Sequence, residues 1–220
     1  MKDELQALLE KLATAFQDAP IKRFAEAQVP SKTWNYSLVT TTLERGQPLI
    51  VGFNWGAAQG EHHPPQQVIA KNDYSEQDRA SLARLDVYCR KIFGPAFLSQ
   101  VSQTNYCFFR SETQAQISDD DLKLCQPIFD ELLSILAPSM VLCFSASLRD
   151  HLIEKKRAVF DRRTTIAYRS GNRNMTYEAM RGRYNDQCAI VSLPHPNAKI
   201  PGEVRDRAWQ ACFPEHLIAA

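Results

Sequence analysis

PLIVGFN, residues 48 to 54, is the stretch that decides the fold of this chain. It is a short run of β-favouring residues that ends in Gly52, Phe53 and Asn54, which is typical of a buried parallel strand entering a loop. Three further apolar runs share this character: VSQTNYCFF (101–109), MVLCFS (140–145) and CAIVSLPHPN (188–197). We therefore expect four buried strands, each followed by a loop.

Helical patterns lie between and around these runs. Apolar residues at steps of three and four predict helices over 2–17, 76–93, 118–137, 146–154 and 202–211, with Ser118 as an N-cap and Pro138 as a stop. The segments TTIAYRS and YEAMRGRY favour peripheral strands or a hairpin. This alternation predicts an α/β fold, a three-layer αβα sandwich with a central, mostly parallel four-stranded sheet, in one domain over 1–220.

Composition narrows the class of protein. The net charge of +1 creates no global field, so any nucleic-acid surface has to be local. The six cysteines form no CxxC pair and several lie in apolar runs, which favours reduced, buried thiols over a disulfide frame, a zinc site or an iron-sulfur cluster. No apolar run approaches membrane length. We expect a cytoplasmic protein that needs no cofactor or metal and does not bind membranes.

Polar side chains follow three of the four predicted strands. They are Asn54, Asn105 and His195, and ligands of parallel sheets bind beyond the carboxyl ends of the strands. After Asn54 the chain continues as GAAQG (56–60), where small residues leave room for a flat ligand close to the backbone.

Taken in order, these runs resemble the uracil-DNA glycosylase superfamily. The matching stretches cover roughly residues 48–200 and are VGFNWG, TNYCFFRSE, CQPIFDELLSILAPSMVLCFS and IVSLPHPN. Asn54 falls on the Asn of the GINPG and GMNPG branches of that family. The iron-sulfur branch carries an acid where this chain has Phe53, which disfavours that branch.

The resemblance implies a monofunctional DNA glycosylase that flips out a pyrimidine, hydrolyses its N-glycosidic bond and leaves an abasic site. Asn54 and His195 would be catalytic, Asn54 by orienting the attacking water and His195 by donating a hydrogen bond to the departing base. Asn105 would read the edge of the base. The residues implied to bind the base are Gly52, Phe53, Gly56 and Asn105.

DNA is the implied partner, and we expect the protein to act as a monomer. Asn197, Lys199 and Ile200 would contact DNA, with Lys199 near a phosphate and Ile200 as an apolar wedge. From Arg149 to Arg183 the chain holds ten basic and four acidic residues, a local excess that suits phosphate contacts.

Two positions depart from the family motifs, and a third distinguishes this chain from one branch of the family. Trp55 replaces a Pro and could reshape the pocket wall or stack on a base, and Asn197 replaces a Ser. In the uracil-selective branch a Tyr at the position of Gly56 blocks bases with a 5-substituent. Gly56 therefore predicts that larger pyrimidines fit, including those of modified viral DNA, and it leaves a repair and a defence role open.

Several alternatives remain at this stage. Asn54 could simply form a turn after its strand, and Asn105 could simply hydrogen-bond backbone groups at a strand end. The basic segment 149–183 could be ordinary solvent-exposed surface. EHHPP (61–65) raises a metal site, although adjacent histidines rarely share one ion. At the level of function, the rivals are a non-catalytic nucleic-acid binding module with this fold and an unrelated α/β enzyme of nucleotide or sugar metabolism.

Overall fold

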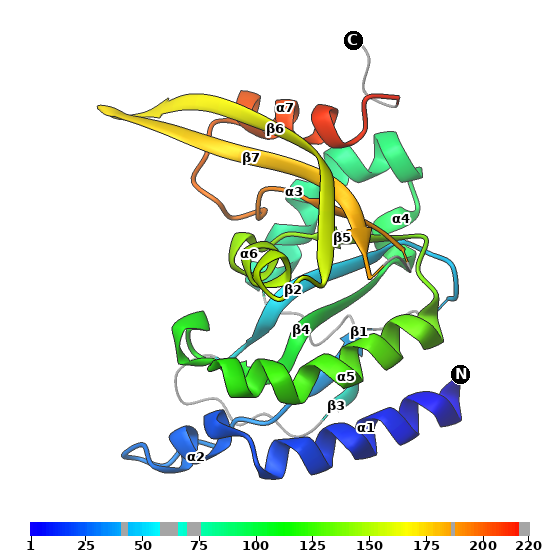
Figure 1. Cartoon of the computed structure of the whole chain (residues 1–220), viewed down its shortest axis with the longest axis vertical. Coiled ribbons are helices and arrows are strands. Elements are labelled where there is room, and N and C mark those ends of the chain that lie inside the picture. Colours follow the sequence, from blue (N-terminus) through cyan, green and yellow to red (C-terminus); the bar gives the residue numbers. More distant parts are fainter. Residues whose placement is uncertain (41–43, 58–65, 70–75, 186–187, 216–220) are drawn as a thin grey trace. The chain divides into compact units, whose positions relative to one another are not determined.

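The computed structural model describes residues 1–40, 44–57, 66–69, 76–185 and 188–215 of a mixed α/β chain (Figure 1). Its residue contacts divide the chain into two compact units. Unit 1 comprises Met1–Gln47, Val51–Asp73 and Ser102–Pro138, and unit 2 comprises Pro48–Ile50, Tyr74–Val101 and Ser139–Ala220. The chain thus passes between the units several times before it ends in unit 2.

Unit 1 contains strands in the hydrogen-bonded order β3-β1-β4-β2. Their bounds are β1 (Ser37–Thr40), β2 (Leu49–Gly56, its first residues in unit 2), β3 (Gln66–Ile69) and β4 (Ser102–Ser111). β1 pairs parallel with β3 and antiparallel with β4. Nearly every residue of β4 is buried, so both faces of this strand are covered, as expected for its continuous apolar run.

The helices of unit 1 are α1 (Lys2–Gln17), α2 (Pro20–Glu26) and α5 (Asp119–Leu136), with a 3-10 turn, η2 (Gln114–Gln116). α5 packs against β4, and α1 packs against α5 (Figure 1). Leu5, Leu8 and Leu12 form the buried stripe of α1, which is the face that its apolar spacing predicts.

Local side-chain chemistry sets both ends of α5. The Ser118 Oγ accepts the backbone N–H of Asp121 (3.2 Å), and the Asp121 carboxylate accepts that of Ser118 (2.9 Å), which completes a capping box. The buried Asp121 carboxylate also accepts the Ile21 N–H of α2 at 3.0 Å. At the other end, Ala137 adopts a left-handed conformation (φ 44°) directly before Pro138.

Unit 2 contains the strands β5 (Met140–Cys143), β8 (Cys188–Ser192), β7 (Arg173–Tyr184) and β6 (Ala158–Ser170), in the hydrogen-bonded order β5-β8-β7-β6. β5 and β8 are parallel, whereas β7 is antiparallel to both β8 and β6. The helices are α3 (Glu76–Phe93), α4 (Phe97–Gln100), α6 (Ala146–Glu154) and α7 (Gly202–Cys212). α7 packs against β6 and β7, and α6 against β5 and β6.

The core of unit 2 lies between α7 and the strands. Leu142 and Val191 join the cluster that contains the fully buried Trp209. Alternate strand residues point to opposite faces, and their neighbours Val141 and Ile190 are buried as well. The β5–β8 pair is therefore covered on both faces.

β6 and β7 form the longest element of unit 2, a hairpin paired from Ala158↔Tyr184 to Ser170↔Arg173. Gly171, with φ +57°, is the first of two turn residues, the position where a type II′ turn requires glycine. The register shifts between Phe160 and Arg162, which leaves one extra residue in β6, a β-bulge.

The predicted helices are confirmed, and TTIAYRS and YEAMRGRY do form a hairpin. The prediction of four strands is wrong, because β1, β3 and the two hairpin strands also pair in the sheet. The sheet was expected to be mostly parallel, and its described pairings are mixed: β1–β3 and β5–β8 are parallel, whereas β1–β4, β6–β7 and β7–β8 are antiparallel. β1 and β3 have only four residues each, too few for a periodic pattern to reveal them. All six cysteines are buried, as predicted, and none is in a disulfide. None of the described helices combines the length and apolarity needed to cross a bilayer.

Candidate functional site

Asn54 lies near the end of β2, where two hydrogen bonds hold its amide. Its Nδ2 donates to the backbone carbonyl of Trp55 and to the Oγ of Ser111, at the end of β4, both at 2.8 Å. The Ser111 hydroxyl in turn donates to the carbonyl of Thr113 at 2.8 Å. A carbonyl can only accept, so the nitrogen of this amide is identified by its partner. Among the described residues none hydrogen-bonds the Oδ1 of Asn54, which leaves this oxygen available to accept.

A buried arginine supports the backbone beside Asn54. Arg110, 7% exposed, donates to the carbonyl of Gly56 at 2.8 Å and to the Oγ of Ser37 at 2.9 Å. The indole of Trp55 donates to the Ser37 carbonyl at 2.5 Å and is itself buried. Trp55 therefore anchors the first motif inside unit 1, and its ring is not presented to a flipped base.

Gly52 is required by the packing of Asn105. A Cβ built on Gly52 would lie 2.1 Å from the Asn105 Oδ1, so the amide of Asn105 occupies the space that any side chain would need. Asn105 is buried at 5% exposure and is the fourth residue of β4. Its predicted place at the end of a strand is thus corrected, because the polar residues at the end of β4 are Arg110 and Ser111.

The space beside Gly56 is open. A Cβ built there would meet no described heavy atom within 4 Å, and Gly56 is exposed. Phe53, one residue before Asn54, is half-buried. The rest of the small-residue loop, together with Glu61, His62 and His63, lies outside the described residues.

In unit 2, His195 follows β8 on a short loop held by Arg205. The Arg205 guanidinium donates to the carbonyls of His195 (2.9 Å) and Ala198 (3.1 Å). The Nδ1 of His195 accepts the backbone N–H of Asn197 at 3.1 Å. Because a backbone N–H can only donate, Nδ1 carries no proton, and the neutral ring presents Nε2–H.

The surroundings of His195 favour this neutral form. Desolvation by the protein, and then the positive charge of Arg205, lower the pKa of His195 below its usual value of 6.5. The ring nevertheless remains exposed. At neutral pH His195 is thus an accessible hydrogen-bond donor rather than a cation.

The other DNA-binding candidates lie on the same loop. The Asn197 side chain accepts a hydrogen bond from Arg84 of α3. Lys199 is exposed, whereas Ile200 is half-buried and packs on the core of unit 2. Ile200 would have to leave that packing to act as a wedge.

Within unit 1 the structure brings Gly52 into contact with Asn105, and Asn54 into contact with Ser111. Within unit 2 it joins His195, Asn197 and Arg205. Four residues of these groups were not predicted from the sequence: Ser37, Arg110, Ser111 and Arg205. For Arg110 and Ser111 a signal existed, since they are the first polar residues after the apolar run YCFF.

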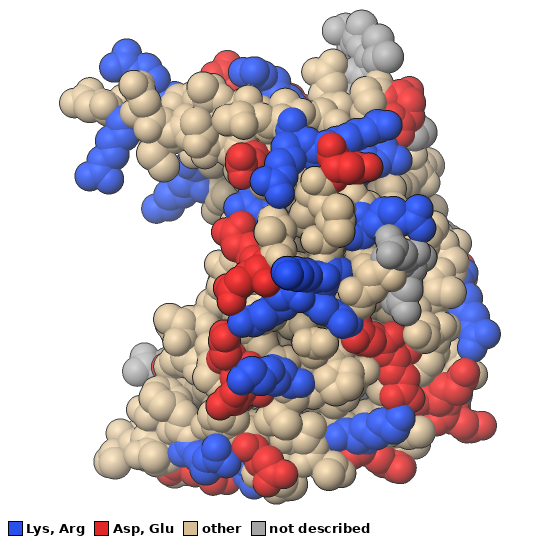
Figure 2. Space-filling model, in the orientation of Figure 1, with Lys and Arg blue, Asp and Glu red and all other residues tan. Residues whose placement is uncertain are grey.

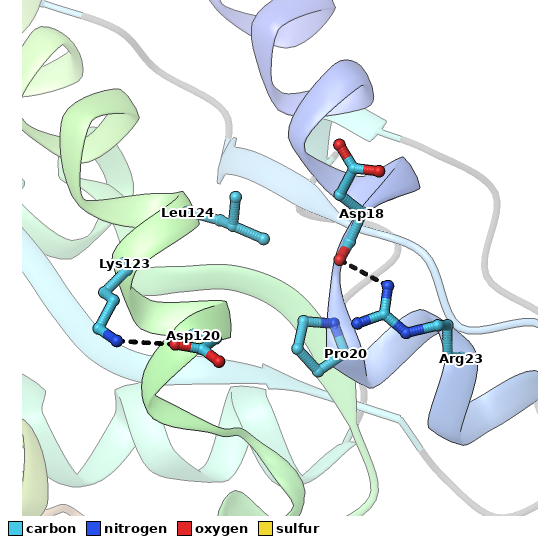
Figure 3. A pocket seen from close by; sticks show the side chains of 6 residues that line it. All are labelled: Asp18, Pro20, Arg23, Asp120, Lys123 and Leu124. Atoms are coloured by element: carbon cyan, nitrogen blue, oxygen red, sulfur yellow. Dashed lines mark hydrogen bonds and ion pairs between the residues drawn. The ribbon is translucent and has the colours of Figure 1, made fainter.

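A separate hollow on unit 1 does not involve these residues. It is lined by Asp18, Pro20, Arg23, Asp120, Lys123 and Leu124 (Figure 3). Lys123 pairs with Asp120 at 2.7 Å, and Arg23 donates to the Asp18 carbonyl at 2.9 Å. With these charged groups engaged in local contacts, the hollow offers no clear catalytic group.

Comparisons with known proteins do not identify the chain: no protein-family model matches it, and no match is found among curated proteins. Within the described part of the chain, no group of three or more His, Cys, Asp or Glu is arranged to hold a metal ion. Function therefore has to be argued from the chemistry of the two residue groups above.

Proposed function

We propose that this protein is a monofunctional DNA glycosylase of the uracil-DNA glycosylase type, which hydrolyses the N-glycosidic bond of a flipped-out pyrimidine and leaves an abasic site. The observation that carries the proposal is the fixed amide of Asn54, whose nitrogen is held by Trp55 and Ser111. The proposal includes the finer fold expected of that family, a three-layer αβα sandwich, acting as a monomer on DNA without a cofactor.

Asn54 suits the task of placing the attacking water. Its Oδ1 can accept a hydrogen bond from a water and direct a lone pair of that water at C1′ of the sugar. An amide cannot take up the proton as a carboxylate can, so the C1′–N1 bond has to break largely before the water adds, and the proton of that water passes to the departing base anion or to solvent. We therefore expect slower turnover than in relatives with an acid at this position.

His195 suits stabilisation of the departing base. When the C1′–N1 bond breaks, the base leaves with the electron pair and its O2 becomes more negative. A donor such as Nε2–H strengthens its bond to O2 as this charge develops, which stabilises the transition state more than the ground state. The Asn197 N–H sets the tautomer that makes Nε2 the donor.

The substrate class follows from Gly56. Because no described heavy atom lies within 4 Å of a Cβ built on Gly56, a substituent at position 5 of a pyrimidine would not meet a side chain of this residue. We therefore favour deaminated or 5-modified pyrimidines as substrates over a strictly uracil-specific role. Its backbone conformation is not one reserved for glycine, so Gly56→Tyr tests this directly. The variant should retain release of uracil and lose release of 5-substituted bases.

The activity is tested by base release from oligonucleotides that contain uracil, mismatched thymine or a 5-substituted pyrimidine. We expect Asn54→Ala and His195→Ala each to lower the single-turnover rate by about 10²–10³-fold. His151→Ala, on α6, is the control and should not alter the rate. The double variant should lose less than the product of the two single losses if both residues serve one transition state.

Two outcomes would refute the glycosylase. The first is DNA binding without abasic sites from any oligonucleotide, which would indicate the non-catalytic binding module. The second is turnover of free nucleosides or nucleotides without action on DNA, which would indicate an enzyme of nucleotide metabolism.

A further inference from the structure

The β6–β7 hairpin is a basic, two-stranded arm. It extends past α7 as a pair of strands with no helix alongside its tip (Figure 1). Its two strands carry six Arg against one Asp and one Glu. In the view of Figure 2, the charged side chains along this arm are mostly blue, that is, Lys or Arg. A positive excess of this size on a protein of net charge +1 is a strongly local feature.

Arg181 of the arm pairs with Glu215 at 3.4 Å, but four other arginines of the arm have no such partner among the described residues. Arg162, Arg163, Arg169 and Arg173 are exposed, and none of them forms an ion pair with a described residue. In contrast, cations on the helices pair with acids, as in Lys11–Glu131, Arg90–Asp86 and Lys123–Asp120. The exposed positive charge of the arm is therefore available to an anionic partner.

The two faces of the arm differ. Residues paired across the strands share a face, and alternate pairs point to opposite sides. Ile166, Tyr168 and Tyr177 lie on one face and pack with the core around α7. The outward face, from Arg163 to the tip, pairs Arg163 with Met180, Thr165 with Glu178, Ala167 with Thr176 and Arg169 with Asn174. On this face Arg163, Thr165, Arg169, Asn174 and Thr176 are exposed, Glu178 is half-buried and Met180 is buried.

This pattern fits duplex DNA. Two paired strands lie about 5 Å apart, and the major groove of B-DNA, roughly 12 Å wide, admits a two-stranded ribbon. Arg163 and Arg169 are six residues apart, so they are separated by about 20 Å along the strand. The hydroxyls of Thr165 and Thr176 and the carboxylate of Glu178 lie between them on the same face. Cations spaced along a ribbon can reach phosphates while the groups between them face the bases.

We propose that the outward face of the β6–β7 arm binds in the major groove of duplex DNA, with Arg163 and Arg169 contacting phosphates. This goes beyond base release and does not depend on it. Asn54→Ala, if catalytically inactive, should bind undamaged duplex as the parent protein does, so that failure of the arm and failure of the glycosylase are distinguishable.

The test is binding to an undamaged duplex, measured by fluorescence anisotropy between about 50 and 200 mM salt. The variant is Arg163→Gln/Arg169→Gln. Log K falls as log salt rises, and losing two phosphate contacts should make this negative slope shallower by about 1.8. Arg163→Lys/Arg169→Lys, which keeps both charges, should retain the slope. The control is Lys2→Gln/Lys91→Gln, which removes two exposed cations from α1 and α3.

Dimethyl sulfate supplies the second readout, because it methylates guanine N7, an atom of the major groove. The parent protein should protect guanines, and the glutamine variant should lose that protection while unfolding at the same temperature. The proposal is overturned if the parent protein does not bind duplex or prefers single strands. It is equally overturned if Arg163→Gln/Arg169→Gln keeps the salt slope of the parent protein or if the Lys2→Gln/Lys91→Gln control changes the slope by as much. It is also overturned if the parent protein protects no guanine.

Discussion

Replacing Gly52 by Ala is expected to destabilise the protein through a collision with one named atom. The new Cβ would lie 2.1 Å from the Asn105 Oδ1, where an ordinary contact starts near 3.4 Å. The oxygen would thus have to move by about 1.3 Å, the difference between these distances. Asn105 is only 5% exposed, so its amide cannot swing freely into solvent. Overpacking of this kind costs about 1–3 kcal/mol.

Urea unfolding followed by circular dichroism measures this cost as a loss in the free energy of unfolding. For a chain of this size, a loss of about 2 kcal/mol corresponds to roughly 4–8 °C in Tm. Asn105→Ala removes the colliding oxygen, so the double variant Gly52→Ala/Asn105→Ala should be more stable than the sum of the single effects allows. We expect a coupling of at least about 1 kcal/mol.

Gly182→Ala supplies a contrast without such rescue. Its Cβ would lie 1.9 Å from the backbone carbonyl oxygen of Val159, opposite the bulge in β6, and no side-chain truncation can remove that atom. If the effects of Gly52→Ala and Asn105→Ala add to within about 0.5 kcal/mol, the contact that explains Gly52 does not exist and the reasoning fails.

Three further predictions test the site and its support. Ser111→Ala removes one of the two acceptors of the Asn54 amide and should slow base release by about tenfold, the equivalent of one hydrogen bond. The control Ser134→Ala, on the exposed side of α5, should not slow it. If Ser111→Ala releases the base as fast as the parent protein, Ser111 does not position Asn54. Asp121→Ala removes the acceptor of three hydrogen bonds to a buried carboxylate, so it should lower the free energy of unfolding, measured with urea, by about 2–4 kcal/mol. The control Asp120→Ala, at an exposed position, should lower it by less than about 0.5 kcal/mol. An NMR titration should give His195 a pKa below 6.5. Because the unfolded chain then binds a proton at His195 at a higher pH than the folded protein does, the contribution of His195 to stability falls as the pH drops below 6.5. A titration midpoint above 6.5 would contradict the neutral state assigned to this ring.

Local chemistry explains why much of the fold could be predicted. Helix periodicity, the Ser118 cap and the Pro138 stop act within a few residues of chain, so the bounds of α1, α3 and α5 follow from neighbouring side chains. The strand pattern of TTIAYRS and YEAMRGRY is equally local, and it indicated peripheral strands or a hairpin. β1 and β3 were missed because four residues show too little pattern, and their pairing depends on strands far away in the chain.

The candidate site divides in the same way. The sequence alone identified Asn54 and His195 as polar groups next to buried strands, and the open position of Gly56. It could not show that the Asn54 amide is held by Ser111, 57 residues away, that Trp55 is anchored to Ser37, or that Asn105 fills the space over Gly52. Propensity and periodicity act along the chain, whereas these contacts depend on the register of paired strands. A shift of one residue would turn each side chain to the other face, so only the tertiary structure decides which atoms meet.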